Sequence, residues 1–137
     1  MATLKLEIVT PDSQVFVGEV DSVLLPGAEG DMGILPHHEL LITELKAGEL
    51  HIVQKGRTQV LAIGEGFAEI TGDSVAVLTD GAVNEQDIDE KVAEAAVKRA
   101  EELLKSATLE GEELEATQAS LARSLVQINV KRRRRSG

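Results

Sequence analysis

The part of the chain before residue 81 consists of short runs in which apolar and polar residues alternate. Leu4, Leu6 and Ile8 alternate with Lys5 and Glu7, and this period of two is typical of a strand with one solvent-facing side. Similar apolar runs cover residues 15–17, 20–25, 40–45, 58–63, 66–71 and 74–79. Short strands separated by turns predict an antiparallel β-sandwich or a flattened barrel.

Glycine and proline mark the turns of this first part. All three prolines, and all glycines except Gly111 and Gly137, lie at or before Gly81. Lys55-Gly56 separates two apolar runs, which predicts a tight β-hairpin at this point.

The spacing of apolar residues changes in the second part. They recur every fourth residue from Ile88 to Leu104 and, after a short connection, at steps of three and four from Leu114 to Ile128. Each pattern places apolar side chains along one stripe of a helix. We therefore expect an antiparallel helical hairpin, with its first turn at residues 86–89, where acidic side chains suit the helix dipole.

The two patterns divide the chain into two domains. We expect a β-sandwich domain over residues 1–83 and a helix-loop-helix domain with a basic tail over residues 84–137. Two helices with one apolar stripe each have no third surface with which to complete a core. We therefore expect the hairpin to lie on the sandwich in one state and elsewhere in another.

The charges are unevenly distributed. The formal net charge is −10, yet the charged residues of positions 131–137 are all basic, namely Lys131, Arg132, Arg133, Arg134 and Arg135. An acidic body argues against nucleic-acid binding, because affinity for phosphates needs a basic surface. The basic tail has two interpretations, a solvated and disordered terminus or a segment that contacts an acidic partner.

Several classes of site are disfavoured. The chain has no cysteine, which excludes disulfides, thiolate metal sites and a cysteine nucleophile. No apolar run is long enough to cross a membrane, and the start does not resemble a leader, so we expect a soluble, unprocessed chain. Gly64-Glu65-Gly66 begins like a dinucleotide motif but lacks a third glycine and a following helix, and so predicts a hairpin corner. We expect no catalytic residue.

The histidines raise the question of a metal site. His37, His38 and Glu39 are adjacent, and imidazole and carboxylate are natural metal ligands. Neighbouring residues of a strand point to opposite faces, so His37 and His38 cannot readily bind one ion together. We expect no metal and interpret these histidines as polar groups that face a partner.

Glycine and proline are densest at residues 26–38, PGAEGDMGILPHH. Taken alone, this segment is either a simple strand connection or a shaped recognition loop. Residues 26–50, PGAEGDMGILPHHELLITELKAGEL, resemble the signature of the epsilon subunit of F-type ATP synthases. The segment QDID at residues 86–89, before an alanine-rich helix, resembles the second landmark of that family. The resemblance covers nearly the whole chain.

The resemblance implies a non-catalytic rotor subunit. In this family the sandwich sits at the foot of the central stalk, where it touches the gamma subunit and the ring of c subunits and helps to turn proton-driven rotation into torque. The chain would then lie on the cytoplasmic face of a bacterial plasma membrane, or on a plastid thylakoid membrane, and only through the complex. By similarity, the residues facing the ring and gamma are Glu29, Gly30, Asp31, Pro36, His37 and His38.

The resemblance also implies regulation. In many bacterial members the hairpin either folds down on the sandwich or extends beside gamma into the head of alpha and beta subunits, where it blocks ATP hydrolysis. An acidic segment of a catalytic beta subunit is the expected target of the basic end. The residues assigned to this role are Arg123, Lys131, Arg132, Arg133, Arg134 and Arg135.

Some relatives bind ATP through the pattern [Ile/Leu]-Asp-x-x-Arg-Ala. Here Ile88, Asp89 and Ala93 match, but Val92 stands where the arginine is expected. An apolar side chain cannot pair with a phosphate, and Arg99, like Arg123 above, is left as a candidate. We therefore expect ATP binding to be weak or absent, and we expect no cofactor.

Two other classes of function compete with the rotor subunit. The first is a free-standing β-sandwich adaptor whose basic tail binds nucleic acid or an anionic membrane. The second is an enzyme with a metal at His37 and His51. The adaptor predicts salt-sensitive binding by the tail alone, and the enzyme predicts a bound metal.

Overall fold

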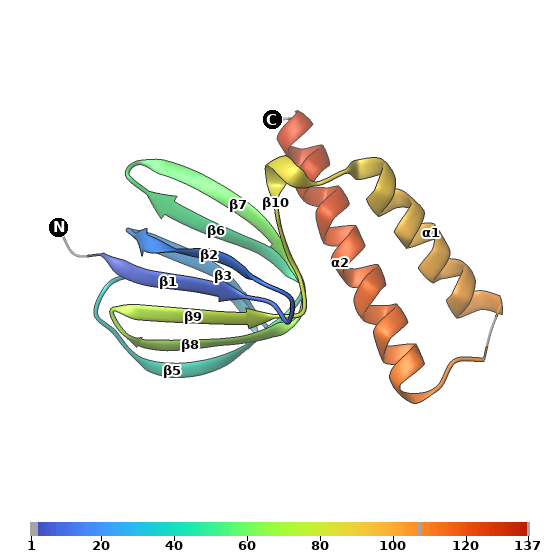
Figure 1. The fold of residues 1–137 in the computed structure, drawn as a ribbon, viewed down its shortest axis with the longest axis horizontal. Coiled ribbons are helices and arrows are strands. Elements are labelled where there is room, and N and C mark those ends of the chain that lie inside the picture. Colours follow the sequence, from blue (N-terminus) through green and yellow to red (C-terminus); the bar gives the residue numbers. More distant parts are fainter. Residues whose placement is uncertain (1–2, 107, 137) are drawn as a thin grey trace.

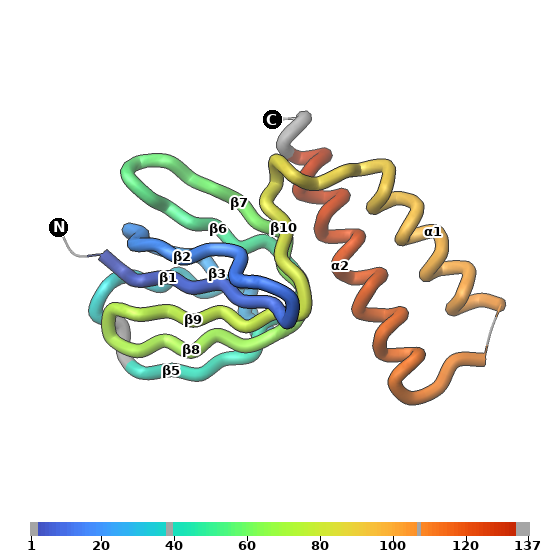
Figure 2. Tube along the Cα trace, viewed as in Figure 1, coloured from blue at the N-terminus to red at the C-terminus, as the bar shows by residue number. Residues whose placement is uncertain are grey.

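The computed structural model consists of a β-sandwich followed by two helices (Figure 1; Figure 2). It describes residues 3–106 and 108–136, with side chains except those of residues 38, 39 and 134–136. The strands are β1 (Leu4–Val9), β2 (Gln14–Val20), β3 (Ser22–Gly27), β4 (Gly30–Ile34), β5 (His38–Leu45), β6 (Gly48–Gln54), β7 (Arg57–Ile63), β8 (Gly66–Gly72), β9 (Ser74–Thr79) and β10 (Ala82–Asn84). A 3₁₀ turn η1 (Glu85–Asp87) precedes α1 (Glu90–Ser106) and α2 (Gly111–Ser136).

The strands form one continuous sheet that folds over on itself. Their order is β10-β7-β6-β3-β5-β8-β9-β1-β2, and β4 pairs with β3 beside this path. Strand β1 pairs in parallel with β9, while the other pairings among the described strands are antiparallel. The sheet end formed by β2 lies against β6, because Gln54 Nε2 donates to Glu19 O (2.6 Å) and Asp21 N, just after β2, donates to Val53 O (2.7 Å). The predicted fold class is confirmed.

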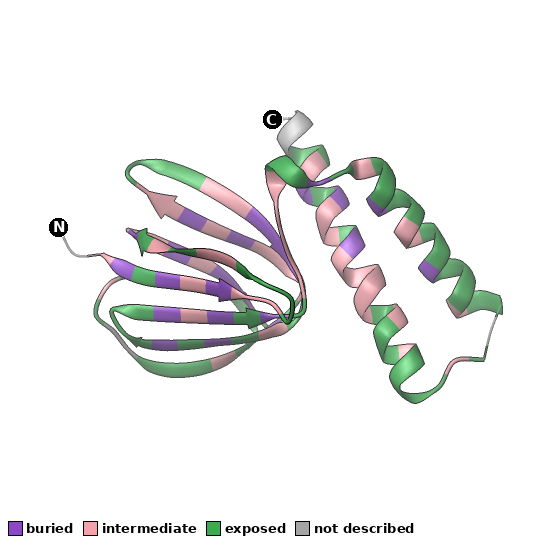
Figure 3. Ribbon diagram, in the orientation of Figure 1, coloured by how far each residue is buried: buried purple, intermediate pink, exposed green. Residues whose placement is uncertain are grey.

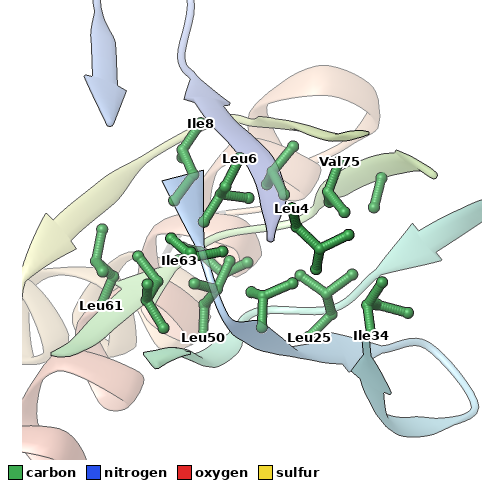
Figure 4. Packing of buried hydrophobic residues seen from close by; sticks show 14 of the residues in the cluster. Leu4, Leu6, Ile8, Leu25, Ile34, Leu50, Leu61, Ile63 and Val75 are labelled. Atoms are coloured by element: carbon green, nitrogen blue, oxygen red, sulfur yellow. The ribbon is translucent and has the colours of Figure 1, made fainter. Parts of the chain in front are cut away.

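The core of the sandwich is built from the inward-facing residues of the alternating runs (Figure 4). The pattern in β1 is confirmed, since its three inward aliphatic side chains are fully buried. The core residues are Leu4, Leu6, Ile8, Val20, Val23, Leu25, Ile34, Leu45, Leu50, Ile52, Leu61, Ile63, Ala68, Ile70, Val75 and Val77. Burial of so many aliphatic side chains provides the main driving force for folding of this domain.

The predicted hairpin at Lys55-Gly56 is confirmed. It joins β6 to β7, and the two residues have positive φ angles of 52° and 77°. This is the backbone geometry of a type I′ turn, which matches the twist of the two strands.

The expectation of a strand connection or a shaped loop over residues 26–38 is wrong in its central part, where residues 30–34 form a strand. Strand β4 pairs antiparallel with β3, from Val23 opposite Ile34 to Gly27 opposite Gly30. The strand was missed because most of its side chains are exposed, so it lacks the buried alternating positions that announce a strand in sequence.

The start of the hairpin differs from the prediction. Residues 86–89 do not form the first turn of a helix, because η1 and an extended Ile88 precede α1. The α-helix begins at Glu90, where Asp89 Oδ1 accepts hydrogen bonds from Lys91 N (3.0 Å) and Val92 N (3.2 Å). Asp89 is therefore the N-cap of α1.

The end of the hairpin differs as well. Helix α2 continues to Ser136, so the interpretation of the basic tail as a disordered terminus is wrong for the described positions. Neither α1 nor α2, within the described residues, carries an apolar stretch long enough to cross a lipid bilayer.

The hairpin rests on the sandwich through α2. Val130 is buried against Ala62 of β7 and Ile88, with Val60, Val83 and Val126 around them. Helix α1 lies outside α2 and is largely exposed (Figure 3); of its residues, Ala93 and Ala100 are buried. One helix therefore carries the contact between the two parts of the chain.

Candidate functional site

The turn between β3 and β4 holds the first predicted group of partner-facing residues. Glu29 and Asp31 are exposed, and Gly30 adopts a φ of 136°, which favours glycine. Ala28 N donates to Glu44 O (3.0 Å), so the turn is fixed against β5. The turn is therefore a shaped and acidic projection.

The second predicted group, residues 36–38, lies at the other end of β4. His37 has a φ of 67°, and its backbone N and ring Nδ1 each lie 3.0 Å from Asp73 Oδ1. His38 opens β5 opposite Gly72, and its side chain lies outside the described residues. Strand β4 has five residues, and at about 3.3 Å per residue it separates the two groups by about 17 Å.

An exposed apolar face on β5, β8 and β9 was missed in the sequence. Leu40 and Ile42 of β5 are 71% and 67% exposed, and Phe67 of β8 and Leu78 of β9 are 53% and 52% exposed. Phe67 lies opposite Leu78, and Ile42 lies opposite Glu69. We call this set, Leu40, Ile42, Phe67 and Leu78, the outer apolar face. The sequence signal for it was the run Leu40-Leu41-Ile42 in β5, because a strand buried on one face alternates apolar and polar residues.

The basic end of α2 is engaged within the chain. Arg132 donates to Glu90 Oε2 (3.0 Å) and to Glu94 Oε1 (2.8 Å), both on α1. The hydrogen bonds to Glu90 and then Glu94 raise the pKa of Arg132 above its ordinary value. This arginine therefore ties the end of α2 to the start of α1.

Lys131 and Arg133 bind elsewhere. Lys131 Nζ donates to the backbone oxygen of Glu85 (3.4 Å), and Arg133 Nη2 pairs with Glu49 of β6. The same Glu49 oxygen lies 3.2 Å from His51 Nε2. The side chains of Arg134 and Arg135 lie outside the described residues. In this arrangement the described cations of the tail face acceptors of their own chain.

Arg123 lies away from the tail on the same helix. Its Nη1 donates to Asp80 Oδ2 (2.9 Å), which follows β9. The structure therefore places Arg123 at the contact between hairpin and sandwich.

The residues considered for nucleotide contact are not gathered into one site. Ile88 is buried under α2, Asp89 caps α1, and Ala93 is buried. Arg99 lines a hollow of about 230 Å³ between α1 and α2, about 15 Å along the helix from Asp89 at 1.5 Å per residue. Val92 is 65% exposed, so the position of the missing arginine faces solvent.

The predicted corner at Gly64-Glu65-Gly66 is confirmed, because it joins β7 to β8 and no helix follows it. His37 lies beside Asp73, and His51 beside Glu49. Among the side chains that the structure describes, no three histidines, aspartates or glutamates converge on a possible metal position.

Comparison with known proteins covers both parts of the chain. The family model for the β-sandwich domain of the ATP synthase delta/epsilon chain matches residues 3–85. The model for the long α-helix domain of the same chain matches residues 86–132.

Individual relatives agree with these models. The chain is 44% identical over 135 residues to the ATP synthase epsilon chain of Dehalococcoides mccartyi strain BAV1, covering 98% of this chain and 96% of the relative. It is 42% identical over 120 residues to the epsilon chain of Desulforamulus reducens, covering 88% and 89%.

Solved structures share the fold. A chain in the OSCP/F1/c-ring structure of the Euglena gracilis mitochondrial ATP synthase has a TM-score of 0.74 at 22% identity, over 92% of this chain and 79% of that one. A chain in the central stalk and c-ring structure of the Tetrahymena thermophila mitochondrial ATP synthase has a TM-score of 0.54 at 12% identity, over 97% and 98%. With both domains matched in order and sequence identity above 40% to full-length relatives, the chain belongs to the delta/epsilon family of ATP synthase chains.

Proposed function

We propose that the chain is the epsilon subunit of an F-type ATP synthase and a non-catalytic part of its central stalk. The observation that carries this proposal is 44% identity over 135 residues to an ATP synthase epsilon chain. The likeness of the fold to a chain from a central stalk supports it.

The outer apolar face is the proposed contact with the gamma subunit. It exposes four large apolar side chains on neighbouring strands, and exposed apolar patches of this kind mark protein interfaces. Burial of these apolar side chains against gamma would hold the subunit in the stalk more firmly than isolated surface ion pairs, which contribute about 0–1 kcal/mol each.

Strand β4 is the proposed edge toward the ring of c subunits. It pairs with β3 and has mostly exposed side chains. With residues 29–31 at one end and residues 36–38 at the other, an edge of about 17 Å lets both groups reach polar loops of the ring. Asp31 at one end and His38 at the other would hydrogen-bond or pair with these loops.

The hairpin is the proposed regulator of ATP hydrolysis. In the docked state the cations of residues 131–133 face Glu49, Glu85, Glu90 and Glu94. In the released state they would reach an acidic segment of a catalytic beta subunit in the alpha and beta head. The chain would lie at the membrane through the complex, on the cytoplasmic face in a bacterium or on a plastid thylakoid.

The adaptor alternative has less support. A tail that binds nucleic acid or an anionic membrane needs free cations, whereas Arg132 and Arg133 here are paired with carboxylates.

The proposal is tested by co-purification with gamma. We expect the full-length chain to bind gamma, and Ile42→Asp to reduce that binding, because a charge on the outer apolar face must be desolvated in the complex. Leu103→Asp, on the partly exposed surface of α1, is the matched control. A full-length chain that does not associate with gamma would sink the proposal.

A second assay addresses regulation. In the reconstituted complex, deletion of residues 131–137 should raise ATP hydrolysis. An unchanged rate would remove the inhibitory role of the tail while leaving the stalk role in place.

A further inference from the structure

Two corners of the sandwich that face α2 are joined by hydrogen bonds. The corner at Gly64 follows β7, and the corner at Asp80-Gly81 follows β9. Gly64 N donates to Gly81 O (2.9 Å). Thr79 is 5% exposed, and its hydroxyl lies 3.0 Å from Gly64 O and 3.1 Å from Gly81 O. These contacts fix the position of Asp80 beside Gly64.

The two glycines leave room for one particular side chain. A Cβ at Gly64 would lie 1.8 Å from Asp80 Oδ1 and 2.9 Å from Arg123 Cδ, and a Cβ at Gly81 would lie 3.2 Å from Arg123 Cδ. Neither glycine is among those with positive φ. Glycine is therefore required at Gly64 for space and not for backbone conformation, and the space holds the stem of Arg123 over Asp80.

A second contact lies further along the same helix. Arg133 pairs with Glu49 of β6, ten residues and about 15 Å beyond Arg123 at 1.5 Å per residue. Val126 and Val130 pack on the sandwich between them. Arg123, Val126, Val130 and Arg133 follow steps of three and four, so one stripe of α2 is complementary to the sandwich.

We propose that this stripe and its receptor form a two-point latch that stores the basic end of α2 on the sandwich. The first point is Arg123 in the pocket of Gly64, Asp80 and Gly81, and the second point is Arg133 on Glu49. The latch sets the fraction of molecules whose hairpin is free. Its regulatory meaning rests on the proposed inhibitory function, because the residues that would inhibit hydrolysis are the ones held when the latch is closed.

Partial exposure makes the latch reversible. The side chains of Arg123 and Asp80 are 35% and 37% exposed, and those of Arg133 and Glu49 are 59% and 22% exposed. Ion pairs at such positions are worth at most about 1 kcal/mol, which is about five-fold in an equilibrium. A partner surface can therefore compete with either point.

The latch can be measured with a single thiol. The sequence contains no cysteine, and Val130 of α2 is fully buried against Ala62 of the sandwich. In full-length Val130→Cys protein, the rate of thiol labelling reports how often α2 leaves the sandwich. We expect Asp80→Asn and Glu49→Gln each to raise this rate by up to about five-fold, and Gly64→Ala to raise it more, because the new methyl group displaces Asp80 and the Arg123 stem.

Matched controls separate the latch from general effects. Gly18→Ala adds a methyl group that would meet ordinary van der Waals contacts, and Glu101→Gln removes an exposed carboxylate from α1. Neither should change labelling. Should Gly64→Ala fail to fold, the two carboxylate variants still provide the test. Equal labelling in Asp80→Asn, Glu49→Gln and the parent protein would overturn the latch.

ATP hydrolysis in the assembled complex distinguishes the latch from the proposed function. Asp80→Asn leaves every residue of the hairpin intact, and it should deepen inhibition if released hairpins inhibit. Faster labelling with deeper inhibition supports the latch and its regulatory role. Faster labelling with unchanged hydrolysis supports the latch and contradicts the inhibitory function.

Discussion

The sandwich and the hairpin are stabilised in different ways. The sandwich buries large aliphatic side chains from nearly every strand in one core. The hairpin buries Ala93, Ala100 and Ile128, and its other large buried residues, Ile88 and Val130, pack together with Ala62 of the sandwich. The sandwich therefore has a core of its own, whereas part of the burial in the hairpin depends on the surface of the sandwich.

The polar contacts within the sandwich also differ from those that hold the hairpin. Inside the sandwich, β-ladders and the buried Thr79 hydroxyl satisfy backbone groups. Between sandwich and hairpin the contacts are partly exposed ion pairs, such as Arg123 with Asp80, which water and salt weaken. A rigid domain carrying a weakly bound arm agrees with the regulation proposed above.

The largest effect is expected in the sandwich core. Leu50 is fully buried, and Leu50→Ala should lower the free energy of unfolding by about 2–5 kcal/mol through lost burial and the cavity left behind. Denaturant unfolding monitored by circular dichroism measures this. Leu103→Ala, at a partly exposed site on α1, should change stability by about 0.5 kcal/mol or less. Equal losses in both variants would contradict the division into core and arm.

A smaller and more local effect is expected at the contact between the two parts. Val130→Ala removes two buried methyl groups worth about 1.5 kcal/mol. Hydrogen exchange of α2 should become about ten-fold faster, since 1.4 kcal/mol is a factor of ten, while exchange of β8 and β9 stays the same. Val92→Ala, the same change at an exposed site of α1, should leave α2 unaffected. Accelerated exchange of the strands in Val130→Ala would argue against a separable arm.

Salt should weaken the arm and spare the sandwich. Raising the salt concentration to about 1 M shortens the screening length to about 3 Å, which reduces the pairs of Arg123 with Asp80 and Arg133 with Glu49. Exchange in α2 should rise by a few-fold, and the protection of β1 and β9 should not fall. The opposite pattern would mean that apolar contact alone holds the helix.

The smallest structural effect is expected from Val92→Arg. Because Val92 is exposed, the change should alter stability by about 0.5 kcal/mol or less. It completes the pattern of Ile88, Asp89 and Ala93, but these residues are not gathered into one site, so isothermal titration should detect little or no ATP binding in the variant or in the parent. Strong binding by the parent chain would refute the role assigned to the missing arginine.

The local features of the fold could be predicted from the sequence. Alternation of apolar and polar residues predicted β1, Lys55-Gly56 predicted the β6–β7 turn, and a change in the spacing of apolar residues predicted the two helices. These features depend on neighbouring residues, and sequence patterns report such dependence directly. Strand β4 could not be predicted, because it forms through pairing with β3 and its own composition does not indicate a strand.

The functional surfaces were less accessible to sequence analysis. The latch joins Glu49, Gly64, Asp80 and Arg123, which are far apart in the chain and individually ordinary. The outer apolar face needs the register of β5, β8 and β9 before Ile42, Phe67 and Leu78 become neighbours. Both surfaces arise from tertiary structure, which a pattern along the chain does not encode.

The central claim is that the hairpin is an arm whose position is chosen by its contacts, on a domain that is stable without it. Hydrogen exchange of the free full-length chain tests this most directly. We expect amides of α1 and α2 to exchange at least about ten-fold faster than the slowest amides of β1, β8 and β9, through opening of the hairpin alone. If the helices and the strands share the same slowest rates, the two parts unfold as one unit and the claim is contradicted.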